Sequence, residues 1–155
     1  MQPSPASYAA PFGRFLLSLI FIASAAGKLN EWEGTAKMMA DKGLPAVDAL
    51  LSVVIVLELV GGLLVLLGFY TRWGAVALLV FLVPVTAIMH NFWAYEGAEG
   101  MQHMINFMKN ISIMGGLLMV FALGPGPMSL DAWLRPVRKV KTLGPIGPIG
   151  PFGPA

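Results

Sequence analysis

The stretch "LELVGGLLVLLGFYTRWGAVALLVFLV", residues 57–83, decides the fold class of this chain. Within it, "LLVLLG" and "GAVALLVFLV" are apolar around their whole circumference, whereas a helix on the surface of a soluble protein carries one apolar stripe. The two halves of the stretch are separated by a short polar interruption that contains Gly68 and Arg72. The stretch therefore predicts two membrane-spanning helices joined by a tight turn.

The rest of the sequence extends this pattern. The chain is 57% hydrophobic and 12% charged, far below the charged fraction of an ordinary soluble domain. A membrane helix needs about 20 apolar residues to cross ~30 Å of hydrocarbon. Four stretches meet this requirement, at about 12–29, 47–67, 73–92 and 105–123. We expect an all-α integral membrane four-helix bundle over residues 12–124, preceded by an N-terminal tail at 1–11.

The first stretch also has features of a signal peptide, because small residues follow its apolar run. Arg14 is the only cation before the end of that run, which is poor for a signal peptide. We therefore expect the segment to be retained as a membrane helix.

Cations in the connections predict the orientation. Four spans place both termini on one side, and six cations lie there: Arg14, Arg72, Arg135, Arg138, Lys139 and Lys141. Four cations lie on the other side: Lys28, Lys37, Lys42 and Lys109. Since positive loops stay in the cytoplasm, both termini are expected to be cytoplasmic.

The sequence after the fourth span predicts two further segments. Residues 125–142 carry Trp133 and a basic cluster, which is typical of an interfacial segment on anionic lipid. The cluster comprises Arg135, Arg138, Lys139 and Lys141. Residues 143–155 form an extended Gly-Pro-rich tail, for which disorder is one interpretation. In the other, Ile146, Ile149 and Phe152 dock on a neighbouring subunit with a preformed extended backbone.

Glu58 is the most anomalous residue, because it lies ~16 Å into its span, near the middle of the bilayer. It shares a helical face with Gly61 and Gly62, so it points toward a close neighbouring helix. Lys109 is expected to be its partner, since the two Gly-Gly pairs suggest similar depths. Lys28, at the outer end of the first span, is the competing candidate.

A ring of polar residues is expected around Glu58 at the outer ends of the helices. The candidate site comprises Lys28, Glu58, His90, Asn91, Lys109 and Asn110, with His103 and Asn106 beside them. In one interpretation these residues form a pocket that holds a quinone head group or relays protons. In the other, a neutralised ion pair fixes the register of the helices, and the remaining residues are interfacial anchors.

Several other kinds of site are not expected. The chain has no cysteine, which excludes disulfides, thiol catalysis and cysteine-ligated clusters. No metal site is expected, and nothing in the spacing of His90 and His103 places them on opposite faces of a haem. Few charges make up the net charge of +2, so no nucleic-acid partner is expected. Ser24 and Thr86 are expected to bond to the preceding turn of their own helix.

Five motifs in order give the chain a family resemblance. They are "GRFLLSLIFIASAAGKL" at 13–29, "KGLP" at 42–45, "LELVGGLLVLLGFYTRWGA" at 57–75, "HNFW" at 90–93 and "FMKNISIMGGLL" at 107–118. Over about residues 13–123 the chain resembles the DoxX family of small four-helix membrane proteins. The family's motif positions correspond in this chain to Lys28, Glu58, Arg72, His90, Lys109 and Asn110. The Gly-Pro-rich tail lies outside the resemblance.

The resemblance implies a bacterial inner-membrane protein. Some family members are linked to the small subunit of a thiosulfate:quinone oxidoreductase, and others to membrane-associated redox-stress complexes. Two functions follow as expectations. The first is a non-catalytic accessory or scaffolding subunit that contacts lipid and other subunits of an electron-transfer complex. The second is a quinone-interacting subunit of an oxidoreductase. A transporter is less favoured, because no broken helix or inverted repeat is apparent.

Overall fold

The chain folds as a bundle of four long membrane-length helices, shown by a computed structural model that describes residues 5–134. The long helices are α1 (Pro5–Asn30), α3 (Val47–Leu67), α4 (Thr71–Met89) and α5 (Gly97–Leu123). Within the described residues, these regions provide four candidate membrane spans. The expected fold class, an all-α membrane four-helix bundle, is confirmed.

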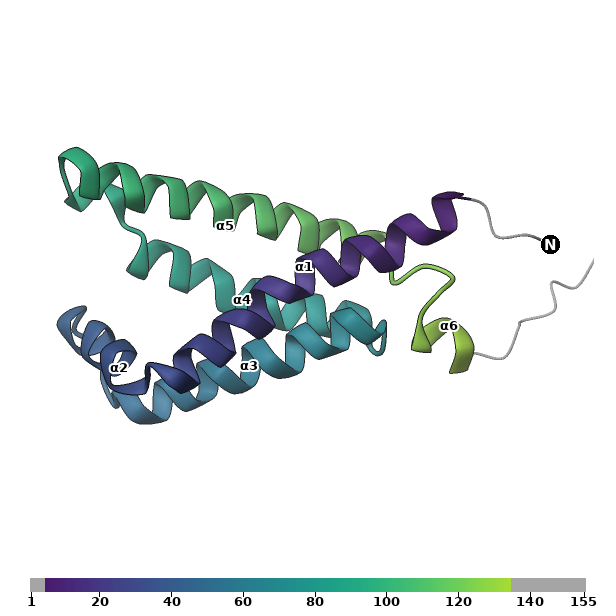
Figure 1. Cartoon of the computed structure of the whole chain (residues 1–155), viewed down its shortest axis with the longest axis horizontal. Helices are drawn as coiled ribbons and strands as arrows, with labels where there is room; N and C mark the ends of the chain where they lie inside the picture. The colour runs from purple at the N-terminus through teal and green to yellow at the C-terminus, as the bar shows by residue number, and fades with distance from the viewer. Residues whose placement is uncertain (1–4, 135–155) are drawn as a thin grey trace, which may run out of the picture.

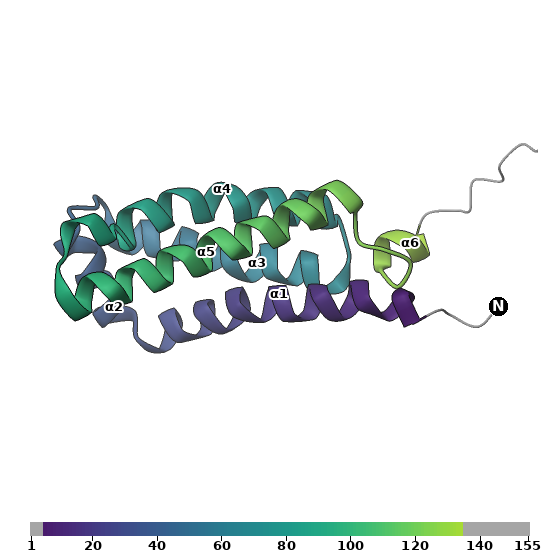
Figure 2. The ribbon, with the colours of Figure 1, turned by 90° about the horizontal axis from the view of Figure 1, so that it is seen from above.

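The helices pack in a simple order. α1 packs on α3, α3 on α4 and α4 on α5, while α1 and α5 make fewer contacts with each other. The chain therefore alternates direction along the bundle (Figures 1 and 2). We call the end with the start of α1 and the end of α5 the terminal end, and the opposite end the α2 end.

The Gly61–Gly62 pair explains why α3 is the central helix. A Cβ at Gly61 would lie 2.7 Å from Cγ of Leu78 on α4, and one at Gly62 would lie 3.1 Å from Cγ1 of Ile22 on α1. Glycine therefore lets the backbone of α3 approach both neighbouring helices, as small residues do between membrane helices. In the second Gly-Gly pair, a Cβ at Gly116 would lie 3.2 Å from Cδ1 of Leu17 on α1, whereas one at Gly115 would meet nothing within 4 Å.

Two short segments complete the α2 end. α2 (Trp32–Asp41) buries Met39 against Ala25, Leu51 and Ile55, and the 3₁₀ turn η1 (Phe92–Ala94) precedes α5. The sequence predicts a loop over 30–46 and a fourth span that begins near 105, whereas the structure has α2 within that loop and begins α5 at Gly97. Hydropathy misses both helical segments because their residues are polar enough to lie outside the hydrocarbon.

At the terminal end, residues 124–134 fold back against the bundle, and we call them the strap. Arg14 is only 5% exposed and donates to the carbonyl oxygens of Pro125 and Met128. The strap ends in α6 (Leu130–Leu134), where Trp133 is 80% exposed. The sequence indicated Arg14 only as a charge that sets the membrane orientation, whereas the structure shows that its bonds hold the strap against α1.

The remaining predictions about the C-terminal region stay predictions. The basic residues Arg135, Arg138, Lys139 and Lys141 and the docking residues Ile146, Ile149 and Phe152 lie outside the described residues.

Candidate functional site

A buried ion pair links α1 to the middle of α3. Lys28 Nζ lies 2.9 Å from each carboxylate oxygen of Glu58, and Ser24 Oγ donates to Glu58 Oε1 at 3.0 Å. Lys28 Nζ also lies 2.5 Å from Ser24 Oγ. The side chain of Glu58 is 4% exposed and that of Lys28 is 23% exposed. Lys28 therefore covers the carboxylate and is the group of this pair that other molecules can reach.

The expected pairing of Glu58 with Lys109 is wrong. Lys109 is exposed and donates to Asn106 on its own helix at 2.9 Å. α4 lies between α3 and α5 in the packing order, so a side chain on α5 does not reach Glu58. Ser24 also departs from expectation, because it bonds to Glu58 instead of the preceding turn.

A second buried polar contact joins α4 to α5. Asn110 Nδ2 donates to Thr86 Oγ1 at 3.1 Å, while Thr86 Oγ1 donates to the Leu82 carbonyl oxygen at 2.6 Å. Thr86 and Asn110 are 2% and 7% exposed. Asn110 is therefore a helix-packing residue of the α4–α5 contact.

Asn110→Ala should lower the free energy of unfolding by about 0.6–1.7 kcal/mol, the range measured for hydrogen bonds between membrane helices. Denaturant unfolding in mixed micelles measures the loss. Ser112→Ala is the control, since Ser112 is exposed and bonds only within α5 among the described residues. It should change the stability by less than about 0.5 kcal/mol. A similar loss in both variants would contradict a special role for the Thr86 contact.

A cleft of about 940 Å³ opens between the helices toward the α2 end. α4 and α5 diverge there from α1 and α3 (Figure 1). Its walls are mainly apolar and come from α3 and α4, including Val53, Val54, Leu57, Val80, Phe81 and Val85. Met38 and Met39 of α2 border it as well. The volume and lining suit a ligand that is mostly hydrocarbon.

Polar groups line the same cleft from two sides. Ser24 and Lys28 come from α1, while His90 follows α4 and His103 and Asn106 belong to α5. The ring centroids of His90 and His103 are 6.0 Å apart. The Nδ1 atoms of both histidines are buried without a hydrogen-bond partner among the described residues. An unpartnered buried nitrogen is costly, so these atoms are suited to bind a polar ligand group.

Lys42, between α2 and α3, forms hydrogen bonds at the α2 end with the segment between α4 and α5. Its Nζ donates to Asn91 Oδ1 at 3.0 Å and to the Tyr95 hydroxyl at 2.7 Å. The Tyr95 ring stacks on His103, with centroids 4.2 Å apart and planes 16° from parallel. Lys42, which lies between α2 and α3, thus holds Asn91 and Tyr95 in place. Tyr95 in turn positions His103, which lines the cleft.

Comparison with known proteins gives the chain a family. A family model described as DoxX matches residues 9–91, which include α2, α3, α4 and most of α1. The chain belongs to the DoxX family. The resemblance seen in the sequence motifs is thereby confirmed.

Two curated bacterial relatives of this DoxX chain are inner membrane proteins by name. Inner membrane protein YphA of Escherichia coli is 36% identical over 118 residues, which cover 76% of this chain and 84% of YphA. Inner membrane protein YqjF of the same organism is 36% identical over 121 residues, covering 78% and 88%. The Surfeit locus protein 4 homolog of Drosophila melanogaster is 26% identical over 136 residues, covering 84% and 42%. No solved structure matches the chain significantly.

The candidate residues and motif positions that the sequence suggested lie in several separate places. Lys28 and His90 line the cleft, and Glu58 lies behind Lys28. Asn91 holds Lys42 beside the cleft, whereas Asn110 bonds to Thr86 and Lys109 to its own helix. Arg72 lies at the terminal end. The cleft thus unites only part of the set that the motifs suggested.

Sequence reasoning missed three contributors to this DoxX site: Ser24, Lys42 and Tyr95. Ser24 precedes Lys28 by four residues, so the helical spacing alone placed the two on one face. No comparable signal connects Lys42 with Tyr95, because 53 residues separate them. Within residues 5–134, no group of three or more His, Cys, Asp or Glu side chains could hold a metal ion.

Proposed function

We propose that this DoxX-family chain is a membrane subunit that binds a lipid-soluble quinone in the cleft at the α2 end. The observation that carries the proposal is the combination of an apolar cavity of about 940 Å³ with polar groups on two sides of it. A quinone has the matching chemistry, since its ring and tail are apolar and its two carbonyl oxygens accept hydrogen bonds. Purely structural anchors would pack solidly and leave no such space.

The residues of the chain fit such a ligand. Lys28 Nζ lies within bonding distance of Ser24 Oγ and both Glu58 oxygens, and it would donate to one quinone carbonyl oxygen by exchanging one of its two contacts with Glu58. His103 or His90 would serve the other carbonyl, since each has an unpartnered buried Nδ1. Stacking on Tyr95 fixes the ring plane of His103. A bound quinone supplies two-electron, two-proton redox chemistry, and the chain positions it.

A role as one subunit of a larger electron-transfer assembly belongs to the same proposal. The sequence has no cysteine, so a reactive thiol or a cysteine-ligated cluster would come from a partner subunit. The names of the bacterial relatives support an inner-membrane location. Both termini are proposed to be cytoplasmic, on the six-to-four excess of cations at that side.

Filling the cleft tests the proposal. Val53 lines the cleft and is 53% exposed, so Val53→Trp adds its ring to the cavity without disturbing a buried residue. Calorimetric titration of the purified chain with decylubiquinone should show binding that weakens about tenfold or more in this variant. Val56→Trp is the matched control on α3, because Val56 is 57% exposed and does not line the cleft.

A second variant tests the polar side. His103→Phe keeps a ring on Tyr95 and removes the nitrogen atoms, so it should weaken decylubiquinone binding and preserve thermal stability. Absence of binding to the unaltered chain, or equal binding by the Val53→Trp and Val56→Trp variants, would contradict the proposal.

A further inference from the structure

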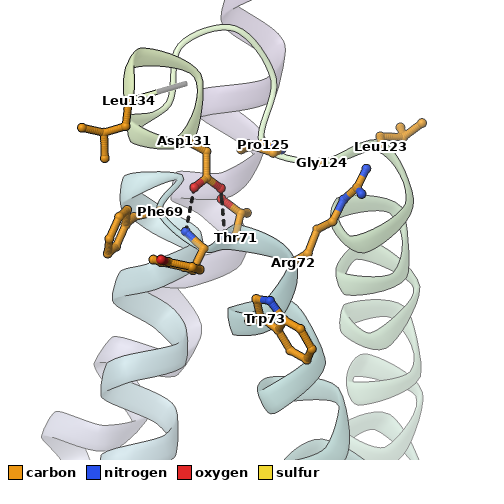
Figure 3. Close-up of a pocket in the computed structure, with 10 residues that line it drawn as sticks. Phe69, Thr71, Arg72, Trp73, Leu123, Gly124, Pro125, Asp131 and Leu134 are labelled. Atoms are coloured by element: carbon orange, nitrogen blue, oxygen red, sulfur yellow. Dashed lines mark hydrogen bonds between the residues drawn. The ribbon is translucent and has the colours of Figure 1, made fainter. Parts of the chain in front are cut away.

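The two ends of the bundle differ in how α3 and α4 are held together. At the terminal end, Figure 3 shows Asp131 of the strap pointing toward Thr71 at the start of α4. The Asp131 carboxylate accepts from the backbone N–H of Tyr70 at 2.9 Å and from that of Thr71 at 3.1 Å. At the α2 end, α4 and α5 diverge from α1 and α3 (Figure 1), and the cleft opens there. The strap therefore fastens α3 and α4 where they join, and the two helices separate toward the α2 end.

Glycines keep α3 and α4 close in the half nearer the terminal end. A Cβ at Gly61 would lie 2.7 Å from Cγ of Leu78, and one at Gly74 would lie 2.8 Å from Cβ of Leu64. Small residues of this kind let the backbones of membrane helices approach each other. The part of α4 that lines the cleft begins after Gly74, at Ala77.

Pro84 explains why α4 then leaves α3. It lies inside α4, five residues before the last residue, Met89, and it lines the cleft. A proline has no backbone N–H to donate, and its ring clashes with the carbonyl group four residues earlier, here that of Val80. This clash separates the turns of the helix on the side of the ring, which is the side of the cleft. α4 therefore bends away from the cleft at Pro84.

Two exposed valines mark a lateral opening of the cleft between α3 and α4. Val53 on α3 and Val80 on α4 both line the cleft, and they are 53% and 68% exposed. A side chain that lines a cavity and is more than half exposed lies at the mouth of that cavity. Val80 lies nine residues from each end of α4, about 14 Å along the helix axis, which is near the middle of the bilayer. The opening therefore faces hydrocarbon.

The polar lining of the cleft comes from other elements. Ser24 and Lys28 belong to α1, His103 and Asn106 belong to α5, and His90 follows the last residue of α4. The apolar lining comes mainly from α3 and α4, on either side of the lateral opening. A ligand with a polar head and a long apolar tail matches this division.

We propose that the head group of the bound quinone lies among these polar groups and that its tail passes between α3 and α4 into the bilayer. This inference rests on the proposed function and adds to it that the chain selects quinones with a long tail. Val80 contacts the tail where it leaves the cleft, and Pro84 keeps the two helices apart. The ligand enters the cleft from the membrane.

Calorimetric titration of the purified full chain with two ubiquinones tests the path of the tail. They share one head group and differ in the tail, which is a long alkyl chain in decylubiquinone and a single isoprene unit in the other. Val80→Trp narrows the lateral opening, so it should weaken binding of decylubiquinone about tenfold or more and that of the short-tailed ubiquinone less than about twofold. Val83→Trp is the matched control on α4, because Val83 is 57% exposed and does not line the cleft. It should change neither affinity.

A second variant tests the bend in α4. Pro84→Ala restores the missing N–H and removes the clash, so α4 should straighten toward α3 and bind decylubiquinone several-fold more weakly. Its thermal unfolding temperature should stay the same or rise, since alanine is the better helix former. Weaker binding together with unfolding at a lower temperature would overturn this role of Pro84 and assign it to packing alone.

The outcomes separate the path of the tail from the proposed function. Equal binding of decylubiquinone by Val80→Trp and Val83→Trp would overturn the tail path. An equal loss for both ubiquinones in Val80→Trp would also overturn it, because the new ring would then fill the head-group site. Absence of binding of either ubiquinone to the unaltered chain would contradict the proposed function itself, and this inference with it.

Discussion

Lys28→Met should lower the free energy of unfolding by about 3–5 kcal/mol, the cost of leaving a buried charge without its partner. Glu58 is 3% exposed at the middle of α3, and Lys28 contacts both of its carboxylate oxygens. In the variant, Ser24 is the one remaining donor to Glu58 among the contacts described. Denaturant unfolding in mixed micelles gives the size of the loss.

Two companion variants separate the ion pair from general effects of charge. The double variant Lys28→Met with Glu58→Gln removes both charges of the pair. No buried charge is then left without a partner, so most of the stability lost in Lys28→Met should return. Lys37→Met breaks an exposed pair with Asp41, whose side chains are 76% and 65% exposed, and should cost less than about 0.5 kcal/mol. Similar losses in Lys28→Met and Lys37→Met would show that burial of Glu58 does not require Lys28.

The double variant also distinguishes the two interpretations of the pair. If Lys28 positions a quinone, the folded double variant should bind decylubiquinone more weakly than the unaltered chain. If the pair only fixes the register of α1 and α3, the double variant should bind normally. The same purified protein therefore serves the stability and the binding measurements.

Gly61→Ala should destabilise the bundle by about 1–3 kcal/mol, as overpacking of a core does. The new Cβ would lie 2.7 Å from Cγ and 2.8 Å from Cδ2 of Leu78. Leu78 is fully buried in the main core cluster, so its side chain has little room to move. The helices α3 and α4 would have to separate, and thermal unfolding should occur at a lower temperature.

Gly115→Ala is the matched control, because Gly115 is the first glycine of the other Gly-Gly-Leu-Leu sequence. Its Cβ would meet nothing within 4 Å, so alanine should keep the stability or raise it by up to about 1 kcal/mol through its helix propensity. Equal losses at Gly61 and Gly115 would contradict the assignment of the cost to Leu78.

The sequence predicted the fold because membrane helices depend on local composition. The run from Val47 to Leu67 is almost entirely apolar, and α3 has the same bounds. Backbone groups in lipid must bond within their own helix, so an apolar run of this length has few alternatives. The polar helix α2 and the first turns of α5 lie outside this rule, and hydropathy did not indicate them.

The candidate site was predictable only in part. Glu58 was conspicuous because a carboxylate at mid-membrane depth requires a partner. Whether Lys28 or Lys109 pairs with Glu58 depends on which helix lies beside α3. The Gly-Gly pairs of α3 and α5 suggested similar depths for Glu58 and Lys109, and therefore the wrong partner. Gly61 and Gly62 approach Leu78 and Ile22, whereas in the other pair Gly116 approaches Leu17 and Gly115 meets no atom within 4 Å. The shared letters Gly-Gly-Leu-Leu do not record this difference.

The sequence by itself determined the four spans, the buried carboxylate and membership of the DoxX family, since each follows from residue type and order along the chain. Only the tertiary structure decided that Lys28 pairs with Glu58, that α4 and α5 diverge at the α2 end to open a cleft, and that Arg14 fastens the strap. These features depend on the order in which helices pack and on the angles between them. Both arise from contacts between residues far apart in sequence, which no local pattern records.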